Sequence, residues 1–121
     1  MPTLVNVPQS DWRGFFDRMS KALLGKWAEI EVASLDLGDQ IVAEWIPLLG
    51  ITYDSRNDLV DVALDRSNHL IRHPRAIVVE QTSAGLASVA VEDEDGARQV
   101  VMLKDPLVLP PATVPVNARP N

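Results

Sequence analysis

The sequence contains no cysteine. Thiolate zinc sites, iron–sulfur clusters, cysteine nucleophiles and a disulfide-stapled secreted scaffold are therefore excluded. It also has no uninterrupted run of about 18 apolar residues, and its N-terminus lacks the basic start and apolar stretch of a signal peptide. Cations are scarce as well, because 11 Lys and Arg stand against 17 Asp and Glu, a net charge of −6 that repels nucleic acid. These absences predict a cytoplasmic protein that binds neither membranes nor nucleic acids.

The chain has the length and composition of one globular domain, with 121 residues of which 46% are hydrophobic. A chain of this size buries roughly two thirds of the surface that its unfolded form exposes, so its core needs neither a disulfide nor a structural metal. Prolines gather after residue 105. We therefore expect an N-terminal arm over residues 1–9, a single globular domain over residues 10–111 and a flexible proline-rich tail over residues 112–121.

A helix is predicted from about Asp11 to Leu24, because apolar residues recur there at steps of three and four. Ser10 is placed to cap the first free amides, and Gly25 is placed to end the helix in a left-handed conformation. We expect one helical face to pack on the core, formed by Trp12, Phe15, Phe16, Met19, Ala22 and Leu23.

After Gly25 the hydrophobic period changes from 3.6 to 2, which indicates strands. Pro47 should end or kink the second of them. The short connections leave little room for crossover helices. The sequence therefore predicts an α+β fold, in which an N-terminal helix packs on an antiparallel, barrel-like β-sheet of about six to seven short strands. The strands are expected at residues 28–32, 40–46, 50–54, 60–64, 76–81, 86–92 and 97–104.

Both histidines and three arginines lie in the segment 65–75. A binding site for a small anion is one hypothesis, in which arginine forks bind a carboxylate or phosphate and a histidine tunes the pH response. The alternative is that the arginines pair with carboxylates of neighbouring strands and the histidines hydrogen-bond to the backbone. The candidate ligand-binding residues are His69, Arg72, His73 and Arg75.

The other groups of polar residues in the sequence do not predict a catalytic or metal-binding site. Asp65, His69 and His73 would share one face of a helix, but Pro74 disfavours helical geometry at His73, so no metal site and no cofactor are predicted. Asp54 to Asp58 is expected to be a hairpin loop rather than a calcium loop. The acidic run 92–95 is expected to be a solvated turn. No GxSxG motif or glycine-rich phosphate loop occurs, so the sequence does not decide whether the protein is an enzyme.

The apolar patch 45–49 is broken by Pro47. It is either a corner where a strand bends into the core, or an interface that a second copy of the chain covers. In the second case the interface residues are Trp45, Ile46, Leu48 and Leu49.

The chain also resembles a family of small bacterial proteins classified as a domain of unknown function. The resemblance covers about residues 8–111 and implies a bacterial source and a self-contained single domain, but no activity and no site residues. The segments that carry it are SDWRGFFDRMS, PLLGITYD, SNHLIRHPR and RQVVMLKDPLVLP.

Together these observations favour a non-enzymatic interaction or assembly module that forms a homo-oligomer or binds a protein partner. The alternative function is a binding domain or enzyme for a small anionic ligand at segment 65–75.

Overall fold

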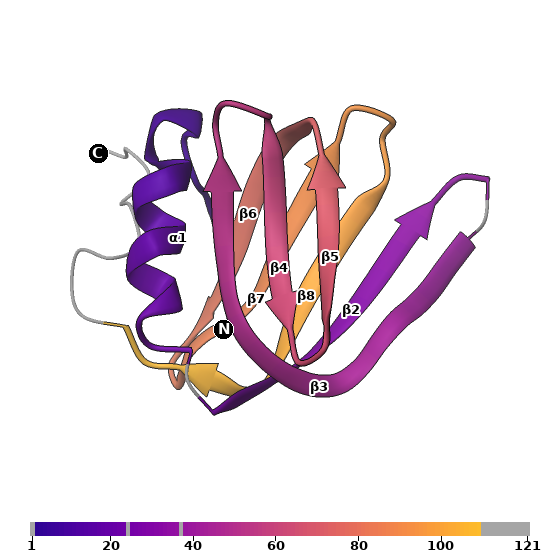
Figure 1. Cartoon of the computed structure of the whole chain (residues 1–121). Helices are drawn as coiled ribbons and strands as arrows, with labels where there is room; N and C mark the ends of the chain where they lie inside the picture. The colour runs from indigo at the N-terminus through magenta and orange to yellow at the C-terminus, as the bar shows by residue number, and fades with distance from the viewer. Residues whose placement is uncertain (1, 24, 37, 110–121) are drawn as a thin grey trace.

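The computed structural model describes residues 2–23, 25–36 and 38–109. One helix packs against a single antiparallel sheet of eight strands (Figure 1). The elements follow along the chain as β1 (Thr3–Asn6), a 3-10 turn (Gln9–Asp11), α1 (Trp12–Ser20), β2 (Lys26–Ser34), β3 (Gly38–Asp54), β4 (Leu59–Leu64), β5 (Ser67–Arg72), β6 (Pro74–Thr82), β7 (Gly85–Asp93) and β8 (Arg98–Leu107).

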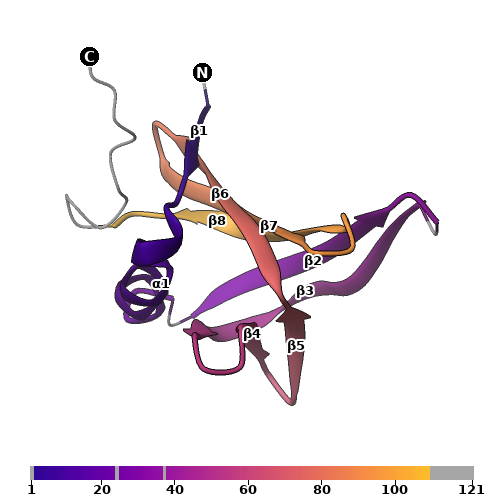
Figure 2. The same ribbon diagram turned by 90° about the horizontal axis from the view of Figure 1, so that it is seen from above.

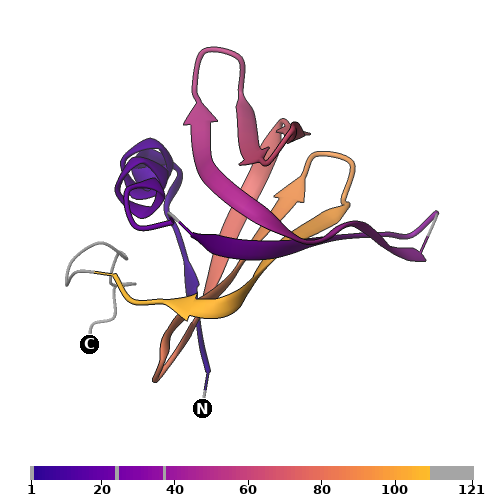
Figure 3. The same cartoon turned by 60° about the horizontal axis from the view of Figure 1, so that its bottom comes forward.

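The strand order is β1-β6-β7-β8-β2-β3-β4-β5, and every neighbouring pair is antiparallel. The antiparallel sheet with an N-terminal helix is confirmed. The barrel-like shape and the count of six to seven strands are wrong, because β1 and β5 are edges of an open eight-stranded sheet. The sheet bends so that β4 and β5 face β6 to β8 across the core, and α1 covers one end (Figures 2 and 3).

The bend lies in β3, which is 17 residues long and takes the place of the two expected strands 40–46 and 50–54. Its first part pairs with β2 and its last part with β4. The register with β2 shifts on both sides of Ile30, and Trp45 has a positive φ of 48°. Such bulges bend a strand and increase its twist. The long strand can therefore belong to both halves of the fold.

The strand also continues through Pro47, where an end or kink was expected. The Pro47 carbonyl accepts a hydrogen bond from the Asp65 N–H at 3.0 Å, on the side of β3 that faces β4. In a strand the N and O of one residue point to the same side, so the missing N–H of Pro47 is not needed for pairing with β2.

Helix α1 is shorter than predicted, and it begins without the predicted cap. Asp11 is the N-cap residue and makes no side-chain capping bond, while Ser10 lies in the preceding 3-10 turn. Gly25 has the predicted left-handed φ of +82°, but it does not end the helix, because α1 stops at Ser20 with Lys21 as its C-cap and Gly25 lies just before β2. Of the predicted core-facing residues, Trp12, Phe15, Phe16, Met19 and Leu23 are buried, and Ala22 is partly buried against the core.

The helix also supplies a hydrogen-bond partner to the backbone of one residue of β3. The Ser20 hydroxyl accepts a hydrogen bond from the Ile51 N–H at 2.9 Å and donates one to the Ile51 carbonyl at 2.6 Å. Ile51 faces Val62 of β4 on its other side. One side chain therefore takes the place of a neighbouring strand at this point.

Two strands were not predicted. The N-terminal segment contributes β1, which pairs with β6, and segment 65–75 is mostly strand because β5 pairs with β4. The helical alignment of Asp65, His69 and His73 therefore does not occur.

The expected tail at residues 112–121 lies outside the described residues. No helix in the described ranges is long and apolar enough to cross a membrane.

Candidate functional site

His73 lies at the corner between β5 and β6, where three turns meet. Its backbone has a positive φ of 53°, which is uncommon for a residue other than glycine. Its N–H donates to the Asp58 carbonyl at 2.8 Å, and its carbonyl accepts from the Glu94 N–H at 3.0 Å. Asp58 itself has a φ of 51°. These two bonds hold the strained corner to the β3–β4 and β7–β8 turns.

The His73 side chain lies between two carboxylates. Its Nδ1 is 3.3 Å from Asp58 Oδ2, and its Nε2 is 3.9 Å from Glu94 Oε1. All three side chains are about half exposed. When the imidazole is protonated it forms an ion pair with each turn, so the cluster joins three connections that are far apart in the sequence.

Tyr53 connects this cluster to the core. Its hydroxyl donates to Asp58 Oδ1 at 2.8 Å, and its ring packs edge-on against Trp12, with 5.2 Å between ring centroids. Trp12 in turn donates its Nε1–H to the Val7 carbonyl at 2.8 Å. Burial, followed by the hydrogen bond and negative charge of Asp58, raises the pKa of Tyr53 to about 12. The phenol therefore remains a hydrogen-bond donor at neutral pH.

The loop before Asp58 is the predicted hairpin loop. Asp54 accepts hydrogen bonds from the N–H groups of Arg56 and Asn57 and from the Asn57 side chain. The Asn57 side chain, ahead of the backbone bonds, lowers the pKa of Asp54. The carboxylate oxygens are used to fold the turn, as in other turns that begin with Asp.

A second polar cluster lies inside the fold. Gln99 and Asp93 are buried, and Gln99 Nε2 donates to Asp93 Oδ2 at 3.0 Å. This fixes the amide so that Gln99 Oε1 faces His69 Nε2 at 2.5 Å. The carboxamide oxygen only accepts, so the His69 proton is on Nε2. The hydrogen bond from His69 to Gln99 thus connects β5 to β8.

Asp93 corrects the prediction of a solvated acidic turn. Its Oδ1 accepts hydrogen bonds from the N–H groups of Asp95 and Ala97, both at 3.0 Å. Together with the bond from Gln99, these bonds give the N–H donors on the inside of the β7–β8 turn a hydrogen-bond acceptor. The other acids of the run remain exposed.

The structure separates the four predicted ligand-binding residues. His69 points inward to Gln99, while His73 lies at the corner. Arg72 and Arg75 are exposed, and within the described part of the chain neither forms an ion pair with a carboxylate. The described residues therefore give no support to the alternative in which these arginines pair with carboxylates of neighbouring strands.

The four predicted interface residues do not form one exposed patch. Leu48 is buried in the core and Ile46 packs against it. Trp45 lies at the bulge of β3 and is partly buried, whereas Leu49 is 59% exposed. Much of the patch is thus a corner where β3 bends into the core.

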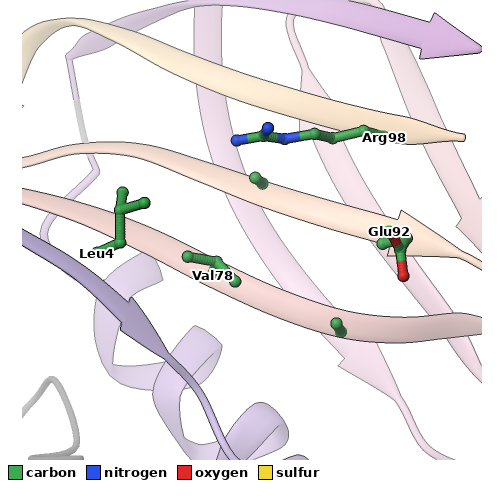
Figure 4. Close-up of a pocket in the computed structure, with 6 residues that line it drawn as sticks. Leu4, Val78, Glu92 and Arg98 are labelled. Carbon is green, nitrogen blue, oxygen red and sulfur yellow. The ribbon is translucent and has the colours of Figure 1, made fainter.

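A groove of about 290 Å³ lies on the outer face of the sheet (Figure 4). Small apolar side chains of β6 and β7 form its floor, Leu4 of β1 lies at its side, and one charged residue of each sign completes it. Its residues are Leu4, Ala76, Val78, Ala90, Glu92 and Arg98. None of them was singled out from the sequence.

The polar partners Asp58, Glu94, Asp93 and Gln99 were also missed as site residues. The only local signal was the positive charge on segment 65–75 beside acidic turns, which does not say which turns converge. In the described ranges, no three His, Asp or Glu residues are grouped so that they could hold a metal ion. The geometry of both histidine clusters is that of turns and strands held together by hydrogen bonds.

Comparison with known proteins agrees with the resemblance inferred from the sequence. The model of a "Family of unknown function (DUF5335)" matches residues 4–112. An uncharacterized protein of Aquifex aeolicus (strain VF5) is 33% identical over 105 residues, which cover 86% of this chain and 95% of that protein. No solved structure matches the chain. On this evidence the chain belongs to the family of unknown function DUF5335.

Proposed function

We propose that the protein is a non-enzymatic module that associates with further copies of itself, and that the projecting hairpin is its contact element. The projecting hairpin is the distal part of β2 and β3, residues 31–36 and 38–43. In Figures 1 and 2 its end extends beyond the rest of the sheet, past the last β2–β8 pair at Ala33. This projection with its uncovered apolar side chains is the observation that carries the proposal.

Three large apolar side chains of the hairpin are open to solvent. Leu35 is fully exposed, and Ile41 and Val42 are 55% and 49% exposed. Single exposed apolar residues are common, but a group of them on one element marks an interaction site. An edge without a neighbouring strand is open to further contacts, and in the described structure the β3 side of this element is such an edge.

The hairpin is supported on one side only. β8 pairs with β2 as far as Ala33, opposite Arg98. Along the other edge, no described residue forms a strand pair with residues 38–46 of β3, because pairing with β4 begins at Leu48. The part of the molecule that carries the exposed apolar groups is therefore also the least covered.

The alternative function, an anion site at segment 65–75, has weaker support. His69 is engaged inside the fold by Gln99. An anion beside His73 would meet the carboxylates of Asp58 and Glu94, which lie 3.3 and 3.9 Å from its ring nitrogens. Like charges at such distances oppose binding.

The proposal predicts a concentration-dependent mass. Light scattering after size-exclusion chromatography should give a dimer or larger species at high micromolar concentration. The double variant L35S/I41T should shift to monomer with an unchanged melting temperature, because both residues are exposed.

The matched control is Leu70→Thr, which removes an exposed apolar side chain of the edge strand β5. It should keep the wild-type mass. A wild-type protein that is monomeric at every concentration, or an L35S/I41T variant with unchanged mass, contradicts the proposed function.

A further inference from the structure

We infer that the tip of the projecting hairpin of one copy docks in the outer groove of a second copy. This inference rests on the proposed function and names the surface that receives the hairpin. The outer groove is formed by the residues drawn in Figure 4, on the face of the sheet that points away from the core. The tip comprises Leu35, Asp36 and Asp39.

The floor of the outer groove is apolar and shallow. Val78 and Ala90 face each other across β6 and β7, and Ala90 is only 8% exposed although it lies on the outer face. Leu4 stands beside this floor with 64% of its surface exposed. The groove therefore offers an apolar side chain contacts on its floor and on one wall.

Arg98 gives the outer groove a positive end. Arg98 and Glu92 are opposite each other in the register of β7 and β8, yet within the described residues Arg98 forms no ion pair. Figure 4 shows the Arg98 side chain running along its strand, with the guanidinium away from the Glu92 carboxylate. An unpaired guanidinium beside an apolar floor suits a ligand that combines an apolar group with a carboxylate.

The tip has this combination. Leu35 is fully exposed, Asp36 follows it directly, and Asp39 lies across the hairpin, opposite Ala33. Leucine can cover the floor while either aspartate approaches Arg98. The tip and the outer groove are thus complementary in both apolar surface and charge. In interfaces the apolar contact contributes affinity and the charge pairs fix the register.

The receiving groove belongs to a second copy rather than to the same chain. Arg98 pairs with Ala33 near the outer end of the hairpin, and the ladder of β2 and β3 ends one residue farther out, at Ser34 opposite Gly38. Leu35 and Asp36 therefore lie beyond the last strand pair and beyond the level of Arg98, and Figure 2 shows this end of the hairpin pointing away from β6 and β7. Folding the tip back would break this ladder.

Docking of the tip is favoured over pairing between two β3 edges. The register of β3 against β2 is interrupted on both sides of Ile30, and Trp45 has a positive φ. Bulges of this kind are a means by which edge strands avoid pairing with another chain.

The test is charge reversal in the full chain, followed by sedimentation. Arg98→Glu should weaken association by about tenfold or more, because a charge-assisted contact becomes repulsive. The matched control is Arg75→Glu, which changes the net charge equally but lies outside the outer groove, and it should associate like the wild type. The triple variant R98E/D36R/D39R should regain association.

A mixing experiment separates this contact from others. R98E and L35S/I41T should each be monomeric alone and associate when mixed, because each supplies the surface that the other lacks. Wild-type association of R98E, or no association in the mixture, overturns the docking inference while the proposed function stands. A wild-type monomer at every concentration overturns both. Circular dichroism should show that each variant is folded, since the substituted side chains are exposed.

Discussion

At the scale of single residues, Tyr53 is the point where the core meets the polar turns. Because its pKa is raised to about 12 from 10.0, the folded protein holds the neutral phenol more strongly than the unfolded chain does. The stabilisation is fully present below pH 10 and is lost as the pH rises through 12. The free energy of unfolding should therefore fall between pH 10 and pH 12.

The chain has one tyrosine, so the ultraviolet absorbance of tyrosinate reports Tyr53 alone. Its midpoint should lie near pH 12 in the folded protein and near pH 10 in urea. Asp58→Asn should lower the folded midpoint, because it removes a charge that favours the neutral phenol. Asp105→Asn, at the far end of β8, should leave it unchanged. A native midpoint near 10 would refute the role given to Tyr53.

At the scale of elements, α1 is joined to β3 by the Ser20 hydroxyl and not by a capped N-terminus. Ser20→Ala removes the partner of both the Ile51 N–H and its carbonyl. We expect a loss of about 1–2 kcal/mol in the free energy of unfolding, measured by urea denaturation.

Ser10→Ala is the control, because Ser10 makes no capping bond in the structure. Its effect should stay within about 0.5 kcal/mol, as for most exposed positions. If Ser10→Ala proves the more damaging of the two, the helix is anchored by its N-terminus instead.

At the scale of the whole molecule, stability should differ sharply between the centre of the sheet and the projecting hairpin. β7 and β8 have neighbouring strands on both sides, whereas the β3 side of the hairpin is unpaired in the described structure. At a concentration where sedimentation gives the mass of a monomer, amide hydrogens of β7 should exchange more than about a hundredfold more slowly than those of residues 38–43. Uniform exchange rates across the sheet would contradict this arrangement.

The parts of the fold that could be predicted are those with a strong local period. The apolar spacing of the helix and the alternation in segments 60–64 and 86–92 led to the correct elements. β5 was missed because Ser67, Asn68 and His69 form a short polar edge strand, whose pairing with β4 decides its conformation. The continuity of β3 was missed because a proline usually ends a strand. Pro47 is tolerated here since its missing N–H would point away from β2 and is not needed for that pairing.

The candidate site was predictable only in part. Segment 65–75 did mark the corner where His73 lies, since charged and aromatic polar groups gather there in the sequence. Its partners come from turns 15 and 21 residues away, and nothing local identifies Asp58 or Glu94 among the many acids of the chain. The inward direction of His69 likewise follows from its strand register opposite Val62.

The sequence by itself determined the absence of thiol chemistry, the buried face of the helix and the strand-rich, antiparallel character of the fold, because composition and periodicity act over a few residues. Only the tertiary structure decided that β3 spans both halves of the sheet, that three turns meet at His73, and that a hairpin projects while a groove stays open on the outer face. Those features depend on the order in which strands pair. Pairing joins segments that are distant along the chain, and no local pattern records it.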